Sequence, residues 1–340
     1  MNSKNLDPNQ FAAILLNWQS NHGRHDLPWQ INPTPYRVLV SEVMLQQTQV
    51  MTVIPYFLKW MDTYPTIQDL ANSSDEQVMS LWQGLGYYSR ARNLRKAAKY
   101  IVEEWNGQFP FDLDSLQKIP GVGRYTAGAI ASFAFNQYGP IVDGNVKRFF
   151  CRFFAIEGIP TAAVVNKKLW ELAHTYTPSE DNRVFAQGLL DIGATICKPK
   201  SPNCEICPFQ SHCKAFTTDQ ISQFPTPKPT KVIPTREGHF YWIENDGQLL
   251  LEKRQDSGIW GGLWCLPEAT EFNSLSQELN LKGSFNHQFS HYKLQAKIWH
   301  HPVDDVVIAQ HAWFTKSQLE EIGLPTPIRK FISKLRIIEK

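Results

Sequence analysis

Four of the six cysteines lie in one short stretch of the chain, and their spacing constrains the fold more than any other feature. The pattern is Cys197-x6-Cys204-x2-Cys207-x5-Cys213. Four thiolates this close together can enclose one metal centre, and soft sulfur ligands select zinc or an iron–sulfur cluster. The spacing alone does not distinguish these two, and four structural cysteines without metal are a third alternative. Cys151 and Cys265 stand alone among apolar residues, so a disulfide framework is not indicated.

The chain is long enough for two domains, since 340 residues exceed what a single core usually holds. Up to about residue 215 the apolar spacing is helical. Phe11, Leu15 and Trp18 belong to one core-facing stripe, which stops at Gly23, and Thr34-Pro35 provides a cap with proline at the first helical position. We predict that this second helix runs to about Gln49. Further helices are predicted at 51–63, 75–83, 90–105, 112–118, 124–135, 145–155, 164–175 and 182–195.

The pattern changes after residue 216. Residues 217–235 contain four prolines among Thr, Lys and Gln, which favours an extended linker. Beyond it, predicted strands at 239–243 and 248–253 flank Asn245-Asp246-Gly247, a hairpin signal, and residues 293–300 alternate as another strand. The predicted organisation is a mainly α domain over 1–216, a linker over 217–235 and an α+β domain over 236–340.

The segment Ile119-Pro120-Gly121-Val122-Gly123 lies between two predicted helices. Its glycines allow tight backbone conformations, and the next helix begins with unpaired N–H groups. Backbone amides of Gly121 and Gly123 can therefore hold a DNA phosphate without reading sequence, although many loops of this kind only turn the chain. Together with the following Arg-Tyr-Thr-Ala-Gly run, the segment matches a helix-hairpin-helix DNA-binding element.

The overall charge of the chain does not indicate a nucleic-acid binder, because the formal net charge is only +2. The first ten residues lack the apolar region of a signal peptide, and no apolar run is long enough to span a membrane. We therefore expect no membrane association. The cysteine usage fits a reducing compartment such as the bacterial cytoplasm, where the protein would associate with the nucleoid, or else a nucleus.

The hairpin followed by this cysteine spacing resembles the endonuclease III superfamily of DNA glycosylases, and further motifs resemble its MutY adenine glycosylase family. These motifs are residues 27–30 (LPWQ), 41–50 (SEVMLQQTQV), 84–88 (GLGYY), 143–148 (DGNVKR) and 261–264 (GGLW). The resemblance extends from about residue 8 to 335. It implies a [4Fe-4S] cluster on the four cysteines and a monomer that excises adenine mispaired with 8-oxoguanine or guanine in double-stranded DNA.

The resemblance assigns Glu42 as the general acid that protonates adenine and then helps to activate water. It assigns Asp143 as the carboxylate that stabilises the sugar cation. From the residues alone, the apolar neighbours of Glu42 would raise its pKa, whereas a mid-helix glutamate is more often on a solvated face. Asp143 precedes a predicted helix, so its ordinary role would be an N-cap, and both roles can hold together.

Tyr125 stands where related glycosylases that also cut the strand carry a lysine that forms a Schiff base. Tyrosine cannot form an imine, so hydrolysis by water without an efficient lyase step is expected. Two roles stay open for Lys147, which are slow trapping of the abasic aldehyde and a phosphate contact.

The resemblance also places several residues against the DNA, because a glycosylase needs its target base outside the duplex. It implies that Leu45, Gln47 and Tyr87 lie along the wedge near the opposing base and Trp29 near the adenine pocket. Each also has an ordinary interpretation as a core, helix-surface or loop residue.

The C-terminal domain resembles a Nudix fold. The run at 267–275 lacks the glutamate-rich magnesium signature of Nudix hydrolases, so pyrophosphatase activity is not expected. The resemblance implies that Phe289, Ser290 and His291 recognise 8-oxoguanine. The Ser290 hydroxyl can both donate to and accept from the altered base edge.

Two other functions remain alternatives. One is an endonuclease III-like bifunctional enzyme that removes oxidised pyrimidines and cuts the strand. Tyr125 and the second domain argue against it. The other is a non-catalytic DNA-binding or redox-sensing cluster protein, which the presence of both Glu42 and Asp143 in matching motifs disfavours.

Overall fold

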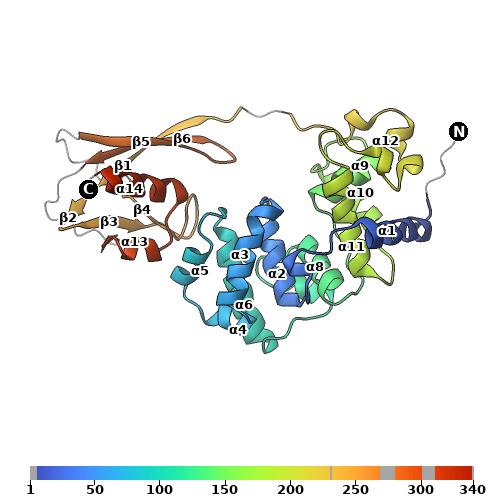
Figure 1. Ribbon diagram of the computed structural model, residues 1–340, viewed down its shortest axis with the longest axis horizontal. Helices are drawn as coiled ribbons and strands as arrows, with labels where there is room; N and C mark the ends of the chain where they lie inside the picture. Colours follow the sequence, from blue (N-terminus) through green and yellow to red (C-terminus); the bar gives the residue numbers. More distant parts are fainter. Residues whose placement is uncertain (1–5, 230–231, 269–279, 301–310, 339–340) are drawn as a thin grey trace. The chain divides into compact units, whose positions relative to one another are not determined.

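The computed structural model describes residues 6–229, 232–268, 280–300 and 311–338. The chain divides into two compact units, which we call unit 1 (Met1–Asn72 and Lys96–Pro229) and unit 2 (Ser73–Arg95 and Thr230–Lys340). Unit 1 is helical, and unit 2 combines strands with helices (Figure 1). The predicted fold class is confirmed, whereas the domain boundaries at 216 and 236 stay predictions.

Unit 1 consists of short helices joined by tight turns. Their bounds are α1 Pro8–His22, α2 Pro35–Leu45, α3 Val50–Thr63, α4 Ile67–Asn72, α7 Leu113–Lys118, α8 Arg124–Ala129, α9 Gly144–Phe153, α10 Ala163–Tyr176, α11 Asn182–Asp191 and α12 Lys214–Thr217. Helix α6, Ser89–Trp105, runs from unit 2 into unit 1. The π-helical segments Ile130–Ala134 and Ile192–Ile196 follow α8 and α11 directly. Helix α11 packs against α1, α9 and both π-helical segments.

Helix starts follow the capping chemistry of the sequence. At α1 the Asp7 carboxylate accepts from the Gln10 backbone N–H at 2.9 Å, and at α2 the Thr34 hydroxyl caps the first turn. The end of α2 differs from the prediction, because the helix stops at Leu45 rather than near Gln49. Gln47 adopts a left-handed φ of 56°, which a continuous α-helix cannot contain, so a turn separates α2 from α3.

An aromatic cluster holds the cysteine loop to the helical core of unit 1. Phe209 lies between Cys207 and Cys213 and is fully buried. Its ring stacks on the ring of Phe11, on α1, with the ring centroids 4.6 Å apart. It also packs against the ring of Phe149, on α9, with a centroid separation of 5.4 Å. Burial of rings this large contributes about 2–3 kcal/mol each, so the loop is fixed by ordinary core packing.

Unit 2 contains two sheets. Strands β1 (Thr235–Trp242), β6 (Lys293–His300) and β5 (Asn280–Gln288) form one, with β1 parallel and β5 antiparallel to β6. In the other, β3 (Gln248–Lys253) pairs antiparallel with β2 (Glu244–Asn245), β4 (Trp264–Cys265) and β7 (His311–Phe314). The helices of unit 2 are α5 (Asp75–Leu81), α13 (Gln318–Glu321) and α14 (Thr326–Ile338), besides the start of α6.

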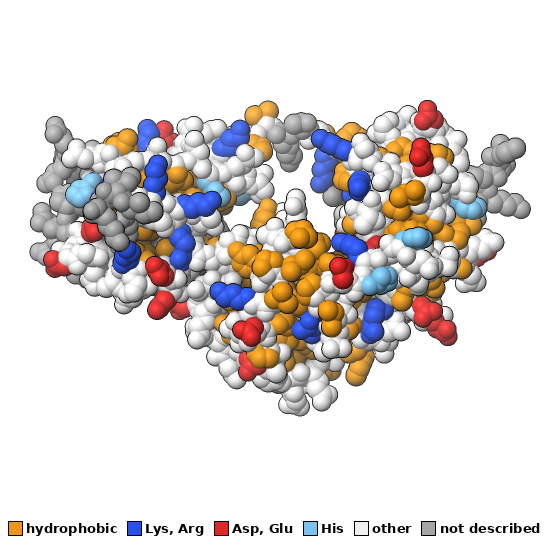
Figure 2. Space-filling view, in the orientation of Figure 1, with side chains coloured by type: hydrophobic (Ala, Val, Ile, Leu, Met, Phe, Trp, Pro, Cys, Tyr) orange, Lys and Arg blue, Asp and Glu red, His pale blue; other side chains and the backbone are white. Residues whose placement is uncertain are grey.

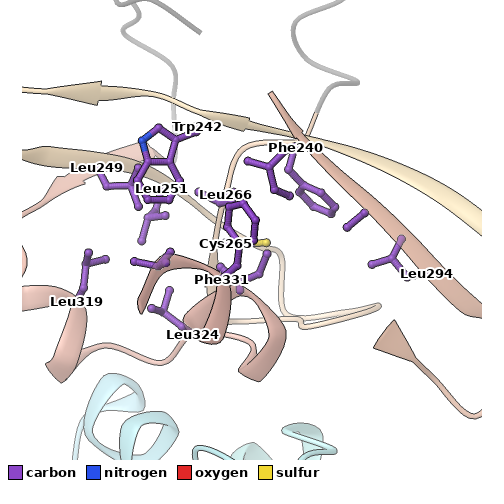
Figure 3. Close-up of a cluster of buried hydrophobic side chains, with 14 of the residues drawn as sticks. Phe240, Trp242, Leu249, Leu251, Cys265, Leu266, Leu294, Leu319, Leu324 and Phe331 are labelled. Atoms are coloured by element: carbon purple, nitrogen blue, oxygen red, sulfur yellow. The ribbon is translucent and has the colours of Figure 1, made fainter. Parts of the chain in front are cut away.

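The core of unit 2 is formed by side chains that the two sheets and α14 direct toward one another (Figure 3). Four of these side chains are completely buried: Trp242, Leu249, Leu251 and Cys265. The ring of Phe331, on α14, packs against the ring of Trp242 with the two ring centroids 6.3 Å apart. The predicted hairpin at Asn245-Asp246-Gly247 is confirmed, since Asp246 and Gly247 have positive φ angles of 47° and 74°, as a type I′ turn requires.

Strand β5 and helices α4 and α14 were not predicted. The sequence of β5 lacks a clear period, whereas both helices carry a local signal: Thr66 caps the start of α4 by accepting from the Asp69 backbone N–H, and Ile328, Phe331 and Ile332 of α14 follow a helical spacing. On the face in Figure 2, basic and acidic side chains are interspersed on both units, in line with the small net charge. None of the described helices is long and apolar enough to cross a membrane.

Candidate active site

Glu42 and Tyr125 are joined by a hydrogen bond in unit 1. The Tyr125 hydroxyl, from the first turn of α8, donates to Oε2 of Glu42 on α2 at 2.7 Å. Glu42 is only 5% exposed, so the solvated helix face is the wrong interpretation for this residue. Burial raises the pKa of Glu42 to about 7, the Tyr125 hydrogen bond opposes this rise, and the nearby Asp143 charge adds to it. Near neutral pH, Glu42 can therefore carry a proton.

Asp143 is the N-cap of α9, as predicted. Its Oδ1 accepts from the Val146 backbone N–H at 2.7 Å, and its Oδ2 accepts from the Asn145 amide at 3.0 Å. Burial raises the pKa of Asp143, while these hydrogen bonds and the Arg148 charge oppose the rise. The Asp143 charge in turn contributes to the raised pKa values of Glu42 and Tyr125, so the three groups lie in one electrostatic environment.

A chain of hydrogen bonds connects Asp143 with the cysteine loop. Asn145 accepts from the Arg148 guanidinium at 2.9 Å, and Arg148 also donates to the carbonyls of Cys197 and Gly193 at 2.7 Å. Gly193 is required for this approach, since a Cβ there would lie 2.5 Å from the Cβ of Asn145. The start of α9 is thus supported directly by the segment that leads into the first cysteine.

A cavity of about 400 Å³ opens beside Glu42. Its wall includes Glu42 together with Trp29, Ser41 and Leu45. Trp29 is buried, and its ring centroid lies 5.6 Å from that of Phe57. The remaining lining residues are Gln19, Ser20, Arg24, His25, Leu27, Gln30, Pro33, Val38, Val50, Phe133, Arg183, Val184, Gln187 and Leu190. The lining is half apolar and half polar or charged and includes one protonatable acid, a combination that suits a planar heterocyclic base.

The predicted hairpin lies between α7 and α8. Gly121 has a φ of 80°, which favours glycine, and both Gly121 and Gly123 are exposed. Gln47 is exposed in the turn after α2, and Lys147 is half-buried on α9. Burial and the charge of Lys228 lower the pKa of Lys147. These four residues are accessible, and their contacts with DNA stay predictions.

The four cysteines line a small common cavity in unit 1. Burial raises the pKa of Cys207 to about 12 and that of Cys213 to about 11, so bound metal is what would make these thiols thiolates at neutral pH. Arg152 donates to the Cys197 sulfur at 3.4 Å. Within the described residues, no three possible ligands lie close enough to share one metal ion. The chemistry of this donor set, four cysteine sulfurs around one cavity, fits an iron–sulfur cluster.

The other predicted DNA-facing residues belong to unit 2. Phe289, Ser290 and His291 form the turn between β5 and β6, closed by the bond from the Phe289 N–H to the Tyr292 carbonyl at 2.9 Å. Ser290 is exposed at the tip of this turn. Together with Tyr87, the turn lines a second cavity of about 380 Å³. Tyr87 is 49% exposed and has a φ of 49°, an unusual conformation for a tyrosine.

Several residues of these sites had not been singled out. Arg24, Arg183 and Gln187 line the cavity beside Glu42, and Trp260 lines the second cavity. Asp191 lies behind the first cavity and is completely buried. An acidic residue inside an apolar helical stretch was the available signal for Asp191, whereas the others carry no local pattern.

Comparison with known proteins agrees with this arrangement. Residues 40–175 match the HhH-GPD superfamily of base excision DNA repair proteins, residues 197–213 the iron–sulfur binding domain of endonuclease III, and residues 239–334 the NUDIX domain. The cysteines therefore belong to an iron–sulfur motif, and the predicted iron–sulfur cofactor is confirmed.

Similarity extends over nearly the whole chain. It is 38% identical to the adenine DNA glycosylase of Buchnera aphidicola subsp. Baizongia pistaciae, over 96% of this chain and 97% of that protein. It is 35% identical to the adenine DNA glycosylase of Homo sapiens, over 94% of this chain and 73% of that protein. Among solved structures, a thermostable thymine-DNA glycosylase superposes with a TM-score of 0.57 at 28% identity, covering 62% of this chain and 97% of that one.

Proposed function

Because the chain belongs to the adenine DNA glycosylase family, we propose that Glu42, Tyr125 and Asp143 carry out its base excision reaction, on adenine opposite 8-oxoguanine or guanine. The observation that carries this proposal is the 2.7 Å hydrogen bond from Tyr125 to the buried Glu42, at the wall of a cavity that fits a base. Action as a monomer is part of the same proposal.

The protein's own groups divide the reaction between them. Tyr125 engages Oε2 of Glu42, so the transferable proton is on Oε1. Glu42 gives this proton to N7 of adenine as the C1′–N9 bond breaks, and the bonding electrons leave with the base. Asp143 stabilises the positive charge left on the sugar. Glu42, now a carboxylate, takes a proton from water as the water oxygen bonds to C1′. The products are free adenine and an abasic site.

The remaining residues bind the DNA. Residues 1–216 form the glycosylase domain, in which Gly121, Gly123 and Lys147 contact phosphates of the duplex. Leu45 and Gln47 of unit 1, and Tyr87 of unit 2, each contact the DNA near the opposing base, and Trp29 lies against the adenine. The four cysteines would hold a [4Fe-4S] cluster in the loop that Phe209 packs against the helical core. After the linker 217–235, residues 236–340 recognise the opposing base through Phe289, Ser290 and His291.

Opposing-base recognition is tested with Ser290→Ala. We expect the ratio of single-turnover rates opposite 8-oxoguanine and opposite guanine to fall about fivefold to tenfold, because one hydrogen bond to the oxidised base is lost. The rate opposite guanine should change little. Ser284→Ala, an exposed serine on β5, is the matched control. An unchanged ratio in Ser290→Ala would remove this residue from the recognition of 8-oxoguanine.

A further inference from the structure

The loop of residues 82–88, which carries Tyr87 and joins α5 to α6, has an unusual backbone. Gly84, Gly86 and Tyr87 all have left-handed φ angles, of 97°, 73° and 49°. Glycine adopts such angles easily, whereas a tyrosine does so only when its surroundings hold it there. The Tyr87 side chain is 49% exposed, so its own burial does not hold it. The contacts that fix this conformation therefore come from neighbouring residues.

Arg90, the second residue of α6, makes these contacts. Its guanidinium Nη2 donates to the Leu85 carbonyl at 3.1 Å and to the Gly86 carbonyl at 3.0 Å. Its backbone N–H donates to the Tyr87 carbonyl at 2.9 Å. The fully buried Trp82 adds a second donor, because its indole Nε1 lies 3.0 Å from the same Gly86 carbonyl. Three consecutive carbonyls of the loop are thus bonded to Arg90.

The same guanidinium also lies over two aromatic rings. Its central carbon is 5.3 Å from the ring centroid of Trp82 and 5.5 Å from that of Tyr87. A cation at such a distance from an aromatic face is attracted to it electrostatically. One face of the Tyr87 ring is therefore held by Arg90, and the exposed part of the ring is left for a partner outside the protein.

The position of Arg90 is unfavourable for the fold by itself. The residue is only 7% exposed, and burial lowers its pKa to about 10, so the guanidinium is still charged near neutral pH. A cation in the first turn of a helix also opposes the helix dipole, which favours anions there. A buried cation at this end of a helix breaks two local rules at once, and such exceptions are typical of functional positions.

We propose that Arg90 is a positioning residue for Tyr87, which holds the loop in the conformation that presents the tyrosine ring to DNA as a rigid stacking surface. The inference rests on the proposed function in taking Tyr87 as a DNA contact. A ring that is fixed in advance binds a base without the loss of conformational freedom that a mobile loop suffers on binding. Arg90 should therefore contribute to DNA affinity only through Tyr87.

The test is a double-variant cycle on DNA affinity, measured by fluorescence anisotropy with the full-length protein. The duplex carries 2′-fluoro-2′-deoxyadenosine opposite 8-oxoguanine, so that the glycosidic bond is not cut during the measurement. Tyr87→Ala should weaken binding about tenfold, because stacking of a base on the ring is lost. Arg90→Lys should weaken it about fivefold to tenfold, since a compact ammonium cannot bond both carbonyls and cover the ring as a planar guanidinium does.

The cycle separates positioning from ordinary structural support. In the Tyr87→Ala background, Arg90→Lys should change the affinity less than about twofold, because the ring through which it acts is gone. Arg95→Lys is the matched control. Arg95 also lies on α6 and donates to a backbone carbonyl, that of Ser73 at 2.7 Å, but this carbonyl is outside the loop. The control should bind DNA as its parent does in both backgrounds.

Two results overturn the proposal, which are an equal loss from Arg90→Lys in both backgrounds and no loss in either. If Tyr87→Ala itself binds normally, the DNA contact proposed for Tyr87 is wrong and the role of Arg90 falls with it. The excision rate of Glu42→Gln tests the active site independently of both residues.

Trp82→Phe decides the question if Arg90→Lys does not fold, as judged by circular dichroism. Phenylalanine keeps an aromatic ring but lacks the donor to the Gly86 carbonyl. In the same cycle, Trp82→Phe should weaken binding about threefold when Tyr87 is present and should have no effect in Tyr87→Ala. An equal effect in both backgrounds, or none when Tyr87 is present, would overturn the proposal.

Discussion

Replacing Glu42 by glutamine is expected to lower the single-turnover rate of adenine excision about a thousandfold, with binding of mispaired duplex changed less than about threefold. Glutamine has nearly the shape of glutamic acid and can still accept from Tyr125, but it has no proton to transfer. Proton transfer by a positioned acid contributes roughly 10²–10⁴ to a rate. Rates are measured with enzyme in excess, and binding by fluorescence anisotropy. Glu103→Gln, an exposed residue of α6, is the matched control.

The same residue determines the expected pH dependence. Burial raises the pKa of Glu42 to about 7, so the acid form is present below about pH 7 and is lost as the pH rises above it. The wild-type rate should therefore fall about tenfold per pH unit on the alkaline side, and Glu42→Gln should lack this limb. A Glu42→Gln enzyme that excises adenine at the wild-type rate would contradict the proposed mechanism.

Asp143→Asn is expected to lower the rate by roughly 10²–10³, because the charge opposite the developing sugar cation is lost. The fold should hardly change, since asparagine caps a helix about as well as aspartate does. The melting temperature should shift by less than about 4 °C, which corresponds to under about 1 kcal/mol. This difference distinguishes the catalytic role of Asp143 from its capping role.

Asp112 provides the control for this comparison. It caps α7 through a 2.8 Å hydrogen bond from the Ser115 backbone N–H, as Asp143 caps α9, but it is exposed. Asp112→Asn should leave both the rate and the melting temperature close to wild type. An Asp143→Asn enzyme within tenfold of the wild-type rate would show that capping is its main contribution.

Local chemistry was sufficient to predict many elements and some site residues. The caps Asp143 and Thr34-Pro35 marked the starts of α9 and α2, and the cysteine spacing indicated a metal loop. The end of α2 was not predictable, since the left-handed turn at Gln47 carries no glycine signal. Strand β5 was missed because its stabilisation comes from pairing with β6.

The site itself depends on contacts between distant parts of the chain. Glu42 and Tyr125 are 83 residues apart, and Arg24 and Asp191 are 167 apart, so no local pattern could have joined them. Burial of Glu42 follows from helix packing around α2, which the sequence of that helix alone does not reveal. The resemblance to a family assigned roles to Glu42 and Asp143, and the fold shows how both come to share one environment.

We propose that the protein hydrolyses the glycosidic bond with water, at a site with Tyr125 in place of an amine. The most direct test incubates excess protein with a duplex that contains one adenine:8-oxoguanine pair and analyses strand breaks with and without alkali. We expect breaks at the adenine position only after alkali treatment, because the product of this mechanism is an intact abasic strand. Equal breakage without alkali would contradict it and would point to an amine nucleophile, with Lys147 as the first candidate.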